Sequence, residues 1–176
     1  VDVNGECYYD EGNVIFEWVG PLKSPINEAG GKRGQHRTSV DAYILAKAEG
    51  KVTQLLIEWK FTETYHGRTY THKFGGLRGN ERLRRYSTVL ANLRKAKDFP
   101  FDMRSEDTFG LADLGYEPLY QLLRMTLLAK TTTPMYLTSD ILVEDYRIVH
   151  LSHSQNAGLN YLSEKHLVFS PGLRNM

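Results

Sequence analysis

The feature that most constrains the fold is a pair of apolar segments on either side of Glu49-Gly50. Ser39–Lys47 (SVDAYILAK) and Val52–Phe61 (VTQLLIEWKF) are both rich in β-branched, aromatic and aliphatic residues, which favour strands. Glycine readily adopts the positive φ that a tight turn requires. We therefore predict an antiparallel β-hairpin that turns at Glu49-Gly50.

The register of this hairpin decides where its charged residues lie. A two-residue turn pairs Ala48 with Lys51, and continuing that register puts Asp41 opposite Glu58. Side chains directly opposite one another have Cβ atoms roughly 5 Å apart, and Lys60 shares the face of Glu58 because side chains alternate along a strand. The opposite face is expected to pack on the core through Val40, Ala42, Ile57 and Trp59. A three-residue loop without a bulge would shift the pairing and separate the two acids.

Two facing carboxylates suit a hard divalent cation. Mg²⁺ and Mn²⁺ prefer oxygen ligands and retain waters that a phosphate substrate can replace. An ion held between Asp41 and Glu58 would lower the pKa of a bound water and neutralise charge that develops on a phosphodiester. Lys60 could orient that water or stabilise the same charge. The pattern therefore favours metal-dependent phosphodiester hydrolysis.

The strings TSVDAYI and LLIEWKF, joined by the hairpin, resemble the D…(D/E)-X-K signature of the PD-(D/E)XK, or restriction-endonuclease-like, nuclease superfamily, in the style of its uncharacterised bacterial branch. The resemblance implies that Asp41 and Glu58 bind the metal and that Lys60 assists the attacking water. It also implies an α/β fold with a restriction-endonuclease-like core, in which helices flank a central mixed sheet that contains the antiparallel motif hairpin. The resemblance spans roughly residues 14–152.

The sequence departs from the family pattern at three points. Val40 stands where the family motif has proline. The family often supplies a further Glu from an N-terminal helix, and the short stretch before the first predicted strand offers only Glu6 and Glu17, so we expect that helix to be missing or replaced. Tyr86 is preceded four residues earlier by Arg82, which does not match the Gln-x-x-x-Tyr motif of the helicase-linked exonuclease branch.

The rest of the chain predicts the flanking elements of one domain, residues 1–176. Val14–Val19 reads as a first strand, and Asn80–Lys97 and Glu117–Lys130 carry leucines at helical spacing. The segment around Tyr136 and the segment Asp145–Ser152 are expected to be strands that complete the sheet. This order of strand, hairpin, helix and strand agrees with the resemblance.

The basic residues are concentrated in one predicted helix. The formal net charge of +1 is too small to attract a polyanion by itself, so contact with nucleic acid requires a local basic patch. Between residues 78 and 97 a single acid, Glu81, faces seven basic residues, which gives a local charge of +6. We predict that Arg78, Arg82 and Arg85 contact backbone phosphates. The alternative is an ordinary solvated helix face.

Composition limits the compartment and the classes of function. Cys7 is the only cysteine, no apolar stretch reaches the roughly 20 residues that span a bilayer, and residues 1–10 do not resemble a secretory signal, so we expect a cytoplasmic protein. The leading hypothesis is a Mg²⁺-dependent DNA nuclease, with Mn²⁺ able to substitute. A homodimer fits this hypothesis because cutting both strands requires two sites. The alternative is a catalytically inactive restriction-endonuclease-like domain that acts as a nucleic-acid-binding or assembly module.

Overall fold

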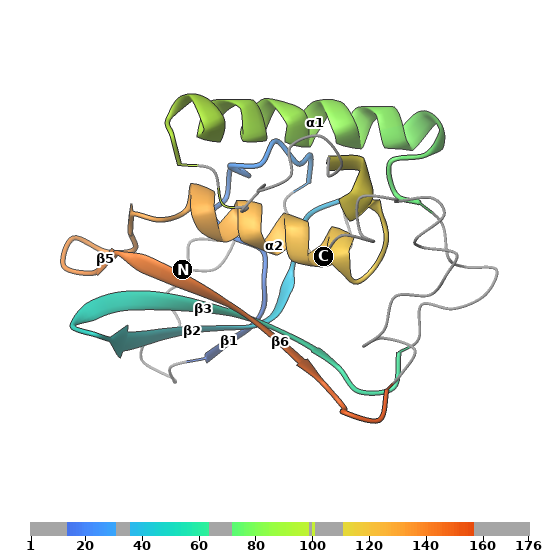
Figure 1. Ribbon diagram of the computed structural model, residues 1–176. Helices are drawn as coiled ribbons and strands as arrows, with labels where there is room; N and C mark the ends of the chain where they lie inside the picture. Colours follow the sequence, from blue (N-terminus) through green and yellow to red (C-terminus); the bar gives the residue numbers. More distant parts are fainter. Residues whose placement is uncertain (1–13, 31–35, 64–71, 99, 101–110, 157–176) are drawn as a thin grey trace. The chain divides into compact units, whose positions relative to one another are not determined.

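The computed structural model describes residues 14–30, 36–63, 72–98, 100 and 111–156 (Figure 1). These residues belong to two compact units. The sheet unit comprises the chain up to Trp59 together with Arg124–Leu151, and the helical unit comprises Lys60–Leu123 and the chain from Ser152 onward. The expectation of a single domain stays a prediction.

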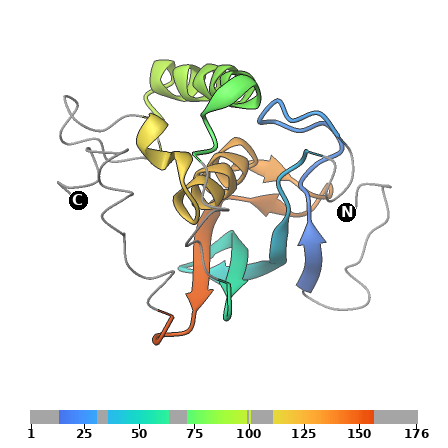
Figure 2. The same ribbon diagram turned by 90° about the vertical axis from the view of Figure 1, so that its right-hand side faces the viewer.

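Four strands form the main sheet in the order β1-β2-β3-β6, with β1 at one edge and β6 at the other (Figure 2). The strands are β1 (Val14–Trp18), β2 (Val40–Ala48), β3 (Lys51–Lys60) and β6 (Asp145–Ser152). The β1–β2 and β2–β3 pairs are antiparallel. The predicted α/β class, the motif hairpin and the strand at Asp145–Ser152 are confirmed.

The hairpin turn has the geometry that fixes its register. Glu49 and Gly50 both have positive φ, 50° and 81°, as a two-residue type I′ turn requires. The β2–β3 ladder then runs from the Ala48–Lys51 pair to the Ala42–Ile57 pair without a slip. The predicted register is therefore confirmed over the paired residues.

The core of the sheet unit lies on the carboxylate face of the hairpin, which corrects the prediction that the opposite face does the packing. The second half of α2 (Leu119–Thr131) crosses this face (Figure 1). The buried Gln54 amide donates to the Ala129 carbonyl at 3.2 Å, and Leu56 is fully buried. Because side chains alternate, Gln54, Leu56 and Glu58 share one face of β3. The apolar surface of α2 packs on that face of β3 and so determines which side of the hairpin is buried.

The other face of the sheet is only partly covered. Phe16 on β1 is 66% exposed, and its ring makes an edge contact with the half-buried ring of Trp59, with centroids 6.2 Å apart. Val40 and Ala42, which lie between these strands, are nevertheless buried. Val40 and Ala42 of the predicted packing face are therefore buried, although the second half of α2 lies on the opposite face.

The segment around Tyr136 was predicted to join the main sheet, and this prediction is wrong. β4 (Met135–Tyr136) pairs with β5 (Leu142–Val143) in a separate two-stranded sheet. The Leu137 amide donates a hydrogen bond to the Ile141 carbonyl at 2.9 Å, and this bond closes the short loop between β4 and β5. The strand is too short to add a row to the main sheet, and Tyr136 is 68% exposed.

The helical unit contains α1 (Gly76–Lys95), η1 (Leu111–Gly115) and the first half of α2. Helix α1 begins four residues before the predicted start at Asn80. A Cβ at Gly79 would lie 2.2 Å from the Phe74 carbonyl carbon, so glycine allows the first turn to pack on the preceding chain. Among the described residues no helix is long and apolar enough to cross a membrane.

Candidate active site

The two predicted metal ligands lie where the hairpin ladder ends. The last paired residues are Ala42 and Ile57, and Asp41 and Glu58 are one position further along. With this turn the 41/58 position is of the non-hydrogen-bonded type, where opposite side chains approach most closely. Asp41 and Glu58 are therefore on adjacent strands, and their direct facing, one step beyond the last pair, stays a prediction.

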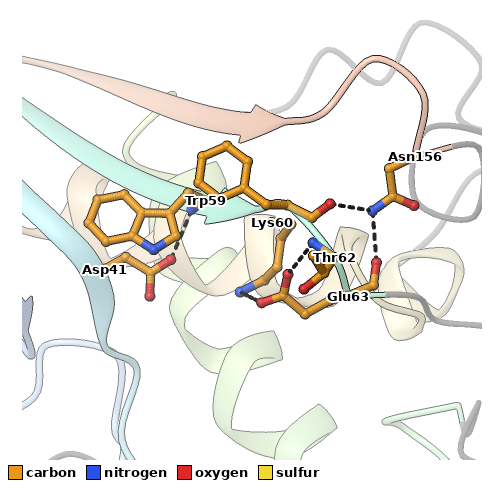
Figure 3. Close-up of polar contacts among 7 residues, drawn as sticks. Asp41, Trp59, Lys60, Thr62, Glu63 and Asn156 are labelled. Atoms are coloured by element: carbon orange, nitrogen blue, oxygen red, sulfur yellow. Dashed lines mark hydrogen bonds and ion pairs between the residues drawn. The ribbon is translucent and has the colours of Figure 1, made fainter.

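Asp41 is held by the main chain of the neighbouring strand. The Trp59 amide donates to Asp41 Oδ2 at 2.9 Å (Figure 3). In a continued ladder this amide would face the carbonyl of Val40. The Asp41 side chain takes over that hydrogen bond where the ladder stops. A short, charged acceptor fixed in this way cannot rotate freely, and its second oxygen, Oδ1, is left for another ligand.

Glu58 is a buried carboxylate on β3. It is 1% exposed and follows the buried Leu56 on the same face of β3. Its Oε2 atom accepts no hydrogen bond from the described residues, while the residue as a whole does make a polar interaction. Removing a charge from water is unfavourable unless a partner or an ion compensates for it. Burial of the Glu58 carboxylate therefore requires a compensating polar partner, and the residue makes such an interaction.

The donor set fits a hard, six-coordinate cation with an open site. Within the described ranges no cluster of three or more His, Cys, Asp or Glu side chains could hold an ion. If Asp41 and Glu58 bind an ion as predicted from the sequence, they would supply two carboxylate ligands, and water or phosphate oxygens the remainder. Mg²⁺ commonly binds through one or two carboxylates and keeps several waters, whereas Zn²⁺ sites use histidine and cysteine.

Glu17, a candidate for the further family glutamate, lies on β1 beside Asp41 in the β1–β2 register. It has a left-handed backbone, with φ at 57°, and its Oε2 accepts a hydrogen bond from Ser39 Oγ at 3.0 Å. This kink turns Trp18 onto the buried face, where its ring stacks on Tyr43 with centroids 4.2 Å apart. Glu17 thus shapes the edge of the sheet next to the site. Glu6 lies outside the described residues.

The loop that leads into β2 is built around one buried arginine. Arg37 is 6% exposed, and burial lowers the pKa of its guanidinium, with Glu28 acting in the opposite direction. Its donors bind the carbonyls of Val19, Pro21, Leu22 and Gly30. Glu28 in turn accepts hydrogen bonds from the amide and the hydroxyl of Thr38 at 2.5 and 2.7 Å. Arg37, which lies just before β2, therefore has a structural role in this loop.

The three arginines predicted to bind phosphate have different environments on α1. Arg78 is exposed. Arg82 donates to the Lys73 carbonyl at 2.8 Å and lies over the Tyr120 ring, 5.9 Å from its centroid. Arg85 pairs with Glu81 at 2.6 Å, and its side chain is only 12% exposed. Phosphate contact through all three stays a prediction, and the structure gives Arg82 and Arg85 partners within the helical unit.

Two residues that make contacts at the end of β3, Glu63 and Asn156, were not predicted from the sequence. Lys60, whose side chain is 12% exposed, lies 4.0 Å from the Glu63 carboxylate, measured from Nζ to Oε1 (Figure 3). Asn156 donates to the main-chain carbonyls of Phe61 and Glu63. The acid three residues after the motif lysine was a signal in the sequence, because such a short spacing brings side chains together at a turn. No local signal identified Asn156.

The comparison with family models decides the family. The model described as "Restriction Endonuclease associating with ARP" matches residues 2–174. The chain belongs to this family. No curated protein and no solved structure matches the chain. The family match supports the restriction-endonuclease-like part of the resemblance seen in the hairpin motif, and the α/β character of a four-stranded sheet together with two helices agrees with it.

Proposed function

We propose that this member of the family is a PD-(D/E)XK-type nuclease that hydrolyses phosphodiester bonds of DNA with the help of Mg²⁺. The observation that carries the proposal is the hairpin register. The ladder ends at the Ala42–Ile57 pair, and continuing its register by one step would put Asp41 opposite Glu58, with Lys60 two residues further along β3. Glu58 is only 1% exposed, whereas a glutamate on an ordinary solvated sheet face would be exposed.

Each of the three residues has a distinct role in this proposal. Asp41 and Glu58 bind the cation through carboxylate oxygens, and the Trp59 amide keeps Asp41 in position for that task. Bound Mg²⁺ would supply an activated water and neutralise charge on the phosphodiester. Lys60 donates hydrogen bonds from its ammonium group to the attacking water or to the phosphate oxygens. Substrate binding draws on basic residues of α1, with Arg78 the exposed member of the predicted set.

Cleavage of plasmid and labelled oligonucleotides tests the proposal. We expect cleavage with Mg²⁺ or Mn²⁺, none with chelator, and little with Ca²⁺, because Ca²⁺ is larger and accepts a looser coordination geometry. Asp41→Asn and Glu58→Gln preserve side-chain shape and should abolish metal-dependent turnover. Lys60→Ala leaves both ligands in place and should slow turnover about 100-fold or more.

The outcomes separate the roles from the fold. Circular dichroism on each variant establishes that the protein is folded before rates are compared. Full activity of Lys60→Ala would overturn the role given to Lys60. A folded wild-type protein that cleaves no form of DNA or RNA in any metal would overturn the nuclease proposal.

A second candidate function is an inactive assembly module. It is favoured by the family description, which speaks of association with ARP. We propose this function in place of the nuclease if the wild-type protein does not cleave nucleic acid. The two functions are also distinguishable by metal dependence, because a binding module would retain its partner in chelator while the nuclease would lose all turnover.

A further inference from the structure

Beyond the metal ligands, the end of β3 holds a second polar arrangement around the motif lysine. Lys60 is the last residue of the strand, and Glu63 follows it at the start of the next segment. Their charged groups are 4.0 Å apart, and the lysine side chain is 12% exposed while the glutamate side chain is 50% exposed. Figure 3 shows the two side chains directed toward each other.

The Glu63 carboxylate is itself fixed by the main chain. The Thr62 amide donates to Glu63 Oε2 at 3.3 Å. A hydrogen bond from its own amide is the largest factor that holds the pKa of Glu63 below its usual range, and Lys60 lowers this pKa further while partial burial opposes both. A carboxylate held by backbone amides is a firmer anchor for an ammonium group than one at the end of a freely rotating side chain.

Asn156 braces the same turn from a distant part of the chain. Its Nδ2 donates to the Glu63 carbonyl at 2.9 Å and to the Phe61 carbonyl at 3.5 Å (Figure 3). Asn156 is 93 residues from Glu63 in the sequence. The backbone that carries Glu63 is thereby tied to the segment that follows β6.

We propose that Glu63 is a positioning residue for Lys60, with Asn156 as the brace that holds Glu63 in place. The inference rests on the proposed nuclease function, in which Lys60 is the catalytic lysine. A lysine side chain loses rotamer entropy when it is ordered, so an anchored carboxylate raises the fraction of molecules with a correctly placed ammonium group. Partly exposed ion pairs contribute little to stability, so the main effect of Glu63 is on catalysis.

The kinetic test compares Glu63→Gln with the wild-type protein. We expect kcat to fall about 10-fold with KM unchanged, a smaller loss than removal of Lys60 itself. Glu63→Asp keeps the charge and should recover part of the loss, and Asn156→Ala should have a weaker effect in the same direction. In a Lys60→Ala background, Glu63→Gln should cause no further loss. Asp145→Asn is the matched control because it removes another ion pair, that of Asp145 with Arg147 at 2.8 Å.

A spectroscopic test does not depend on activity. In protein with isotope-labelled lysine, the Lys60 signal is identified by its absence from Lys60→Ala. Glu63→Gln should shift this signal, and Asp145→Asn should not. An unchanged Lys60 signal in Glu63→Gln would overturn the proposal, as would an equal loss of kcat in the wild-type and Lys60→Ala backgrounds. If the wild-type protein cleaves nothing and the signal still shifts, the nuclease function fails while the Lys60–Glu63 contact stands.

Discussion

Charged residues in the sheet unit and in α1 of the helical unit carry different kinds of information. In the sheet unit, Glu58 and Arg37 are buried, and Asp41 is hydrogen bonded to the main chain of the next strand. In α1, many basic residues are exposed, and Arg82 and Arg85 are engaged with neighbours in their own unit. We therefore give more weight to a charged residue that strand register places on a buried sheet face than to the number of charged residues on a helix when we propose catalytic residues.

The largest effect on stability is expected at Arg37, the buried arginine of the sheet unit. Arg37→Met leaves four backbone carbonyls without the guanidinium that binds them, and we expect the free energy of unfolding to fall by about 3 kcal/mol or more. Arg82→Met, which loses one hydrogen bond and one ring contact, should lower it by about 1–2 kcal/mol. Urea denaturation measures both. The exposed Arg84→Met is the control and should change little; equal losses for all three would contradict the comparison.

The second prediction sharpens the difference between the two carboxylates. Asp41→Ala loses the hydrogen bond from the Trp59 amide and should lower the free energy of unfolding by about 1–2 kcal/mol in chelator. Glu58→Gln keeps the shape of a buried side chain and removes the repulsion expected if the two carboxylates face each other, so it should raise the free energy of unfolding under the same conditions. Thermal unfolding without metal measures both signs. Destabilisation by both variants would mean that Glu58 is held for structural reasons.

The third prediction concerns DNA binding by α1. Arg78→Ala should reduce the slope of log K against log salt by about 0.9, because each phosphate contact releases condensed counterions. Arg82→Ala and Arg85→Ala also test the original assignment, and each should be compared at equal folded fraction because both side chains have partners in the helical unit. Fluorescence anisotropy with a labelled duplex provides the affinities. Unchanged slopes in all three variants would make α1 an ordinary solvated helix.

The smallest expected effect is the titration of a buried tyrosine in the helical unit. Tyr116 is 4% exposed, and burial raises its pKa above the ordinary value near 10. Because the pKa is higher in the folded state, the protonated Tyr116 hydroxyl favours folding at alkaline pH less and less. Its contribution to the free energy of unfolding is full below the ordinary tyrosine pKa and is lost as pH rises through the folded-state pKa. Tyr116→Phe should therefore show slightly less destabilisation at alkaline pH than the wild-type protein. Identical alkaline unfolding curves would show that Tyr116 titrates normally.

The hairpin could be predicted because its information is local. The Glu49-Gly50 turn and the alternation along two strands fix the register from the Ala48–Lys51 pair to the Ala42–Ile57 pair without reference to the rest of the chain. The covered face of the sheet could not be predicted in the same way, because it depends on where α2 packs. Charge patterns also fail to reveal partners, so neither the carbonyls around Arg37 nor the long-range contact of Asn156 had a signal in the sequence.

The central claim is that the hairpin register builds a divalent cation site from Asp41 and Glu58. The most direct measurement is titration of the protein with Mn²⁺, with free Mn²⁺ followed by electron paramagnetic resonance, in the wild-type protein and in Asp41→Asn and Glu58→Gln. The account predicts one bound ion per wild-type chain, weak or absent binding in each variant, and unaltered binding in Lys60→Ala. Binding by the wild-type protein that survives both carboxylate substitutions would contradict it.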